Sequence, residues 1–130
     1  MRHCLDSWAV LEWLAGGEPA RTRIAGLFAA ERPVMSWINL GELAYVLRRR
    51  AGPRAAEEVV ARLRSRLALE VPSPERVLAA AAIKADHAVA YADAFAVATA
   101  LATGCILVTG DPELLAAGAG WAIEDLRPDT

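Results

Sequence analysis

Residues 106–114 read ILVTGDPEL, an apolar run that stops at a threonine, turns at Gly110 and then presents a carboxylate. The apolar residues of 105–109 predict a short buried strand. Asp111 followed by Pro112 is typical of a helix start, because the Asp side chain accepts from free backbone N–H groups and proline fits the first helical position. Taken alone, Asp111 therefore needs no role beyond that of a helix cap.

The same alternation of short apolar strands and helices runs through the whole chain. Strands are expected at residues 2–5, 34–37, 69–71, 105–109 and 121–123. Helices are expected over residues 7–14, from Pro19 to before Pro33, from a cap at Asn39 to 51, over 53–67, 74–84, 92–103, and briefly from 112. Parallel strands need crossovers that cover both faces of a sheet, so the pattern indicates an α/β fold with a mainly parallel sheet.

Composition and length bound the possible classes of protein. The chain has 130 residues, of which 55% are hydrophobic and 23% charged, as expected for one globular domain over residues 1–130. Asp6 interrupts any signal-peptide core, and the longest apolar runs, such as 77–83, fall far short of the roughly 20 residues of a membrane span. A cytoplasmic protein with no membrane partner is expected, with Cys4 and Cys105 as buried free thiols.

Four acids occupy corresponding places in this pattern. Asp6 follows the first strand, Glu42 lies in the first helical turn after the second, Asp93 opens a late helix, and Asp111 follows the fourth strand. Each has an ordinary explanation as a helix cap, a capping box from Asn39 to Glu42, or a partner of a helix dipole. However, the carboxyl ends of parallel strands meet at one edge of the sheet. We therefore expect these acids to converge there.

Convergence of carboxylates requires compensation. Two of them about 5 Å apart repel by about 3 kcal/mol at an effective dielectric constant near 20. A divalent cation neutralises such a cluster directly, and an all-oxygen ligand set suits Mg²⁺ or Mn²⁺ better than zinc. Ions of this kind activate water and neutralise transition-state charge in phosphoryl chemistry. The four acids therefore indicate phosphodiester hydrolysis.

Four segments resemble the PIN-domain ribonucleases and, within them, the VapC-type toxins of toxin–antitoxin pairs. They read CLDSWAVLEWL, NLGELAYVL, YADAFAVATALATG and ILVTGDPEL, and together they span essentially the whole chain. The resemblance implies a single three-layer α/β/α domain with a short central sheet, whose acidic pocket binds Mg²⁺ or Mn²⁺ and cleaves RNA endonucleolytically. It also implies a cognate VapB-type antitoxin and a homodimer as partners.

Carried over by position, the resemblance assigns Asp6, Asp93 and Asp111 as metal-binding acids. Glu42 would be the fourth acid, holding the metal directly or through a water. Thr109 matches an auxiliary hydroxyl that would orient Asp111 or such a water, although an ordinary β-branched strand residue is the equal alternative. The sequence departs from the family at residues 37–39, Trp-Ile-Asn, where small hydroxyl residues are more usual.

Three other functions are alternatives to a ribonuclease, and two of them lack a residue that they would need. A haloacid-type phosphatase would need an Asp-x-Asp motif where this chain has Asp6-Ser7-Trp8, and a phosphoacceptor domain would need a late lysine where Lys84 is the only one. A catalytically silent module that binds RNA or protein is the main alternative. His3 and His87 are weak candidates for a general base.

Two surface features are also open. The seven arginines between residues 48 and 66 would face solvent, RNA or a partner. The apolar helix faces between residues 19 and 67, with Trp13 and Trp37, exceed what one small sheet needs, which favours association with a second copy.

Overall fold

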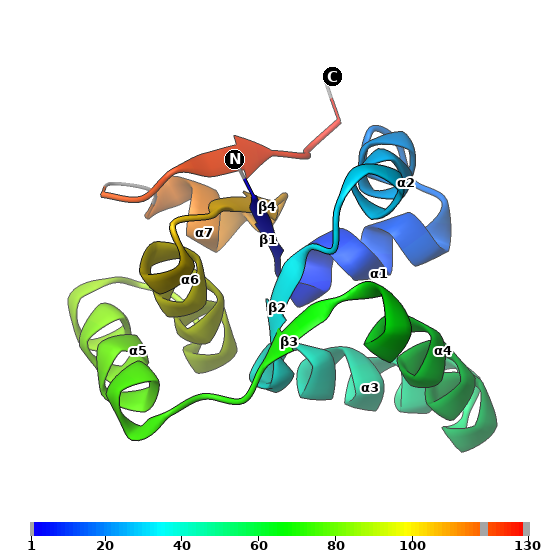
Figure 1. Cartoon of the computed structure of the whole chain (residues 1–130), viewed down its shortest axis with the longest axis horizontal. Helices are drawn as coiled ribbons and strands as arrows, with labels where there is room; N and C mark the ends of the chain where they lie inside the picture. The colour runs from blue at the N-terminus through cyan, green and yellow to red at the C-terminus, as the bar shows by residue number, and fades with distance from the viewer. Residues whose placement is uncertain (1, 118–119, 129–130) are drawn as a thin grey trace.

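The computed structural model describes residues 2–117 and 120–128 (Figure 1). Its five strands form one sheet in the order β3-β2-β1-β4-β5, and every pairing is parallel. The strands are β1 (His3–Leu5), β2 (Val34–Ser36), β3 (Ala68–Glu70), β4 (Ile106–Thr109) and β5 (Ile123–Asp125). The expected α/β fold with a parallel sheet is thus confirmed.

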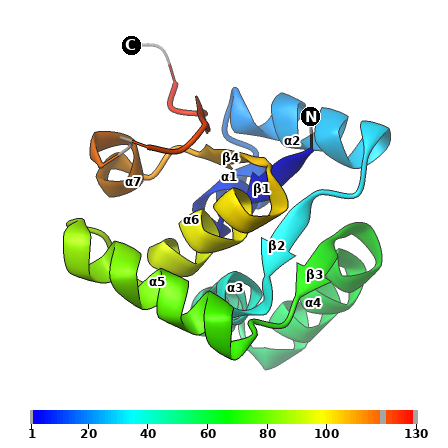
Figure 2. The same cartoon turned by 60° about the vertical axis from the view of Figure 1, so that its left-hand side comes forward.

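Helices cover both faces of the sheet, which gives three layers (Figures 1 and 2). One layer holds α1 (Ser7–Ala15), α2 (Ala20–Ala30), α3 (Trp37–Ala51) and α4 (Pro53–Arg66); the other holds α5 (Pro74–Asp86), α6 (Tyr91–Thr103) and α7 (Pro112–Ala116). Successive strand residues point to opposite faces, as the pleat requires. Leu5, Met35 and Val108 pack with the first layer, whereas Cys4, Val34 and Leu107 pack with the second.

The strand order reverses between β1 and β4. From β1 the chain moves outward through β2 to β3, then crosses to β4 on the other side of β1 and continues to β5. Open α/β folds bind their ligands at the carboxyl ends of the two strands where the order reverses. The ends of β1 and β4, which are followed directly by Asp6 and Gly110, are therefore the expected place for a site.

Two expected boundaries were wrong. Helix α3 begins at Trp37 and not after Asn39, because the Ser36 hydroxyl already accepts the Ile38 N–H at 3.2 Å and caps the helix. The small hydroxyl residue missing from positions 37–39 is thus present one residue earlier. Strand β5 covers Ile123–Asp125 and not 121–123, because its hydrogen bonds to β4 continue into polar residues at the sheet edge.

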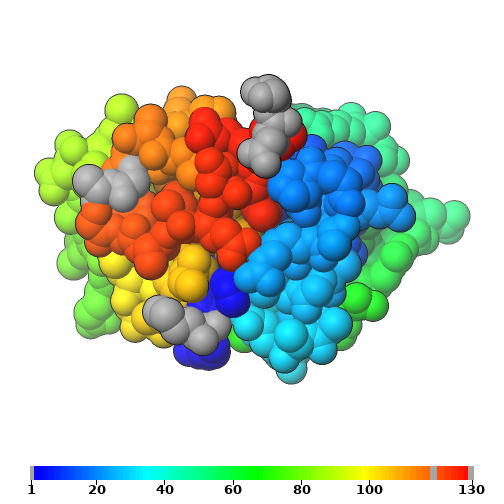
Figure 3. Space-filling view, turned by 90° about the horizontal axis from the view of Figure 1, so that it is seen from above, coloured from blue at the N-terminus to red at the C-terminus, as the bar shows by residue number. Residues whose placement is uncertain are grey.

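An ion pair links the last strand, β5, to α2. The Arg23 guanidinium of α2 donates to the Glu124 carboxylate of β5 at 2.8 and 3.0 Å. In the space-filling view the red C-terminal segment adjoins the blue α2 (Figure 3). The strand itself is held by its parallel pairing with β4, and the ion pair adds a link between β5 and α2.

The surface differs from the expectation of apolar faces between residues 19 and 67. Two of the exposed large apolar residues, Ile38 and Tyr45, lie in that range, whereas Val71, Val77 and Leu78 lie at α5 and just before it. The apolar faces of α2, α3 and α4 are largely packed in the core. Within residues 2–117 and 120–128, no helix is long and apolar enough to cross a membrane.

Candidate functional site

Asp6 lies completely buried at the end of β1, where it caps α1. Its Oδ1 accepts the Ala9 N–H at 2.9 Å, and its Oδ2 accepts the hydroxyl of Thr109. The pKa of Asp6 is raised to about 7, chiefly by burial and further by the charges of Asp111 and Glu42, although both hydrogen bonds favour the charged form and lower it. Asp6 is therefore a helix cap whose charged form is disfavoured by burial and by the neighbouring acids.

Thr109 connects the two strands at the point where the sheet order reverses. Besides donating to Asp6, its hydroxyl accepts the backbone N–H of Asp111 at 3.0 Å. The side chain is fully buried. From the sequence, this hydroxyl was expected to orient Asp111 or a water. In the structure its O–H group also donates a hydrogen bond to Asp6.

Asp111 is a helix cap and also faces another acid. Its Oδ1 accepts the Glu113 N–H at 2.9 Å, so the cap interpretation is correct. The preceding Gly110 is required by close approach, because a Cβ at this position would overlap the indole ring of Trp8. The backbone conformation of Gly110 does not call for glycine, since its φ is not among the positive ones.

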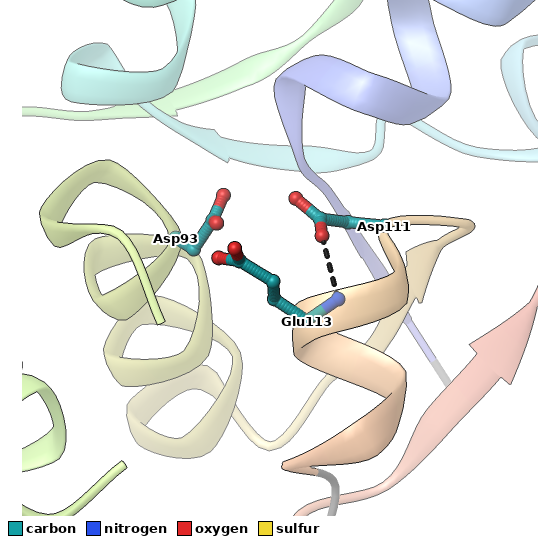
Figure 4. A group of neighbouring side chains, drawn as sticks. All are labelled: Asp93, Asp111 and Glu113. Atoms are coloured by element: carbon teal, nitrogen blue, oxygen red, sulfur yellow. Dashed lines mark hydrogen bonds between the residues drawn. The ribbon is translucent and has the colours of Figure 1, made fainter. Parts of the chain in front are cut away.

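Asp93 lies in the first turn of α6 with only 6% of its surface exposed. Burial raises the pKa of Asp93 to about 8, and the negative charges of Asp111, Asp6 and Glu42 add to this effect. Carboxylate oxygens of Asp93, Asp111 and Glu113 lie within 4.8 Å of one another (Figure 4). Three acids from two helices thus converge on one small volume.

Glu113 is an acid of the site that the sequence pattern does not predict. It stands two residues after Asp111, in the first turn of α7, where an acid is ordinary because it interacts favourably with the helix dipole. Figure 4 shows its side chain extending towards Asp93. Nothing local distinguishes it from a dipole partner, so only the approach of α6 reveals it.

Glu42 lies in the second turn of α3, not the first, so a capping box with Asn39 was wrong. The Ser7 hydroxyl donates to its Oε1. Asn39 is instead fully buried, and its Nδ2 donates to the Ala92 carbonyl at 3.0 Å. Asn39 thereby ties α3 to the helical turn that carries Asp93.

Four of the acids line an open hollow of about 510 Å³, whereas the fully buried Asp6 does not line it. Its lining includes Glu42, Asp93, Asp111 and Glu113 with Ser7, Trp8, Leu11, Val46, Ala90 and Pro112. None of these residues is basic, so within the described part of the chain the acids have no counter-charge in the hollow. Carboxylate oxygens alone, without sulfur or imidazole, fit Mg²⁺ or Mn²⁺.

The histidines lie outside this hollow. His3 is at the amino end of β1, the opposite edge of the sheet, where its Nδ1 lies 3.1 Å from Glu31 Oε2. His87 contacts Trp121 edge to face, with ring centroids 5.0 Å apart. Neither is therefore positioned as a general base at the acids.

Several arginines of the 48–66 cluster cover aromatic rings. The guanidinium groups of Arg49, Arg64 and Arg66 lie 5.1, 5.1 and 5.8 Å from the ring centroids of Tyr45, Trp37 and Phe28, respectively. Cation–π contacts of this kind give these three side chains an intramolecular role.

Solved structures similar over nearly the whole chain share this fold. VapBC2 from Rickettsia felis, crystallised with a promoter DNA fragment, superposes with a TM-score of 0.77 at 16% identity, covering 98% of this chain and 100% of that one. DNA-bound VapBC from Salmonella typhimurium gives 0.76 at 24%, covering 96% and 98%. VapC20 from Mycobacterium tuberculosis, a sarcin–ricin loop cleaving toxin, gives 0.72 at 23%, covering 97% and 99%.

The sequence itself matches a family model. No curated protein sequence matches the chain, but the model of the PIN domain matches residues 3–119. That span contains the acids Asp6, Glu42, Asp93, Asp111 and Glu113, together with four of the five described strands. The chain belongs to the PIN domain family.

Proposed function

We propose that this protein is a metal-dependent endoribonuclease of the VapC type. The observation that carries the proposal is the meeting of Asp93, Asp111 and Glu113 in a hollow without a basic lining residue. Membership of the PIN family and the likeness to VapBC structures support it. RNA as substrate is supported by the similar VapC20, which cleaves an RNA loop.

Each acid has a distinct place in the proposed mechanism. Asp93, Asp111 and Glu113 would hold Mg²⁺, or Mn²⁺ as a substitute, with Asp6 as a further ligand once its proton is lost. When bound, the ion supplies charge neutralisation at the scissile phosphate and activation of the attacking water. Thr109 keeps Asp6 oriented by donating to its Oδ2.

Glu42 is suited to a proton-accepting or water-orienting role. Ser7 donates to its Oε1, which fixes the carboxylate at the wall of the hollow and leaves the other oxygen available. Ligation of the metal by Glu42, directly or through a water, is the alternative arrangement. A Glu42→Gln variant that binds Mn²⁺ normally but cleaves slowly would favour the proton-accepting role.

The test combines metal binding with cleavage. Asp93→Asn should abolish the Mn²⁺ signal change in electron paramagnetic resonance titrations and stop Mg²⁺-dependent RNA cleavage. Glu58→Gln, an exposed acid of α4 remote from the hollow, is the matched control and should behave as wild type. A wild-type protein that binds Mn²⁺ and RNA but never cleaves would instead support the silent binding module.

An antitoxin is the proposed physiological inhibitor. The acidic hollow suits an arginine side chain, because a guanidinium pairs bidentately with carboxylates and would take the place of the metal. We also propose a homodimer, for which the exposed Val71, Val77 and Leu78 offer apolar surface. Light scattering after size exclusion tests the dimer, and a monomer at micromolar concentration would exclude it.

A further inference from the structure

A second hollow, of about 540 Å³, adjoins the acidic one. Asp86, His87 and Ala88 at the end of α5 form one wall, and Glu113 and Ala116 of α7 are on the other. Glu113 and its neighbour Pro112 line both hollows. A polynucleotide whose phosphodiester lay at the acids would therefore place an adjacent nucleotide in this second hollow, which has the volume of a small-ligand pocket.

The wall that carries His87 is held by three hydrogen bonds. The His87 N–H donates to the Ile83 carbonyl at 3.0 Å, and the Val89 N–H donates to the His87 carbonyl at 3.0 Å. Lys84 Nζ donates to the Val89 carbonyl at 2.7 Å. The imidazole ring itself packs edge to face against Trp121. A preformed wall lowers the entropic cost of binding a ligand.

The chemistry of the lining selects one part of a nucleotide. No lysine or arginine lines the hollow, and the carboxylates of Asp86 and Glu113 would repel a phosphate. A base is compatible, because RNA-binding sites stack bases on planar side chains and bind their Watson–Crick edges by hydrogen bonds. A carboxylate accepts two parallel N–H bonds, and guanine is the RNA base that offers two adjacent donors, N1–H and N2–H.

We propose that this second hollow is a guanine-binding subsite for the nucleotide next to the scissile phosphate. His87 contacts the face of the base, and Asp86 accepts from N1–H and N2–H. The inference rests on the proposed function only in taking RNA as the ligand. Binding of the base itself needs neither metal nor cleavage, so the subsite is testable separately.

The two histidines of the chain provide an internal reference for the test. Untagged protein in EDTA is titrated with guanosine, inosine or uridine, which carry no phosphate for the acids to repel, and the imidazole C–H signals are followed by NMR. Guanosine should shift the His87 signal and leave His3 unchanged, while inosine, which lacks the N2 amine, binds at least about fivefold more weakly. The absence of a His87 shift with guanosine, or an equal shift with uridine, would overturn the proposal.

Substitutions on α5 test whether Asp86 is the carboxylate that accepts from guanine. Asp86→Asn should reduce the preference for guanosine over inosine to about one, because the amide has one acceptor oxygen where the carboxylate has two. Glu75→Gln, an exposed acid on the same helix, should keep the wild-type preference. An Asp86→Asn protein that melts like wild type and keeps the preference contradicts the assignment.

Cleavage of a randomised RNA separates the two proposals. Wild type should cut with guanine enriched at one position next to the cut, and Asp86→Asn should lose that enrichment. If no RNA is cut but guanosine still shifts His87, the proposed nuclease function fails and the subsite stands. If RNA is cut without preference for guanine, the subsite fails alone.

Discussion

The hydroxyl of Thr109 donates to Oδ2 of Asp6 and thereby joins the ends of β1 and β4, 103 residues apart in sequence. The hydroxyl oxygen of Thr109 also accepts the backbone N–H of Asp111. A single buried hydroxyl thus positions two of the acids at the point where the strand order reverses.

Thr109→Val removes this hydroxyl while keeping the shape of the side chain. We expect the free energy of unfolding to fall by about 1–3 kcal/mol, because Asp6 then keeps a buried oxygen without a donor. Mn²⁺ affinity should also fall, since loss of that hydrogen bond raises the pKa of Asp6 further. Thr109→Ser keeps the hydroxyl and is the control. Its free energy of unfolding, measured in urea, and its Mn²⁺ affinity, measured by titration, should stay closer to the wild-type values than those of Thr109→Val.

The metal-free protein should lose stability as the pH rises. Asp6 and Asp93 have folded-state pKa values of about 7 and 8, above the ordinary value of 3.8, so between these limits the folded state holds more protons than the unfolded state. Their favourable contribution is complete below about pH 4 and is lost as the pH passes through 7 and 8. The pKa values of Glu124 and Asp125 are lowered in the folded state, so these two groups change the stability only at pH values below the range in which Asp6 and Asp93 titrate.

Urea unfolding in EDTA at pH 5.5, 7 and 8.5 measures this effect. Asp93→Asn should flatten the pH dependence and be more stable than wild type at pH 8.5, because one repelling charge is gone. Stability that rises over this range in the wild-type protein would show that the pKa values of Asp6 and Asp93 are not raised in the folded state.

Gly110→Ala tests the contact between the turn and α1. The added methyl group overlaps the indole of Trp8, so we expect a loss of about 1–3 kcal/mol from overpacking and weaker Mn²⁺ binding. Gly26→Ala, in the middle of α2 with open space around it, should instead gain about 0.5–1 kcal/mol. Equal melting temperatures for the two variants would mean that Trp8 moves freely.

Ser36→Ala tests the corrected start of α3. Loss of the hydroxyl that accepts the Ile38 N–H should cost about 1 kcal/mol. Asn39→Ala should cost stability for a different reason, because it removes the bond to the Ala92 carbonyl. Only the second variant should also weaken Mn²⁺ binding, since that bond adjoins Asp93.

Local signals in the sequence were sufficient for the fold and for the helix starts at Asp6, Asp93 and Asp111. Strand ends and helix starts leave marks within a few residues, as in the Asp111-Pro112 pair, and parallel topology then places those ends at one edge. Asp6, Asp93 and Asp111 could be located in this way without knowledge of any contact. Glu42 was placed on the right helix but in the wrong turn.

Contacts between distant segments could not be read from the sequence. Gly110 looks like a turn residue in the sequence. In the structure, glycine is required there because the indole of Trp8, from α1, occupies the space of a side chain. Glu113 looks like a partner of its own helix dipole until α6 brings Asp93 beside it. The cap at Ser36 was hidden because Trp37 has high strand propensity and lengthened the expected strand.

The rate of Mg²⁺-dependent RNA cleavage by Asp111→Asn tests the central claim most directly. Asparagine keeps the cap on the Glu113 N–H, because its side-chain oxygen accepts as Asp does, but it removes a negative charge from the acids. We predict a fall of about 100-fold or more, with a circular dichroism spectrum and melting curve like those of wild type. An Asp111→Asn protein that cleaves RNA at the wild-type rate would contradict the account and leave Asp111 as a helix cap alone.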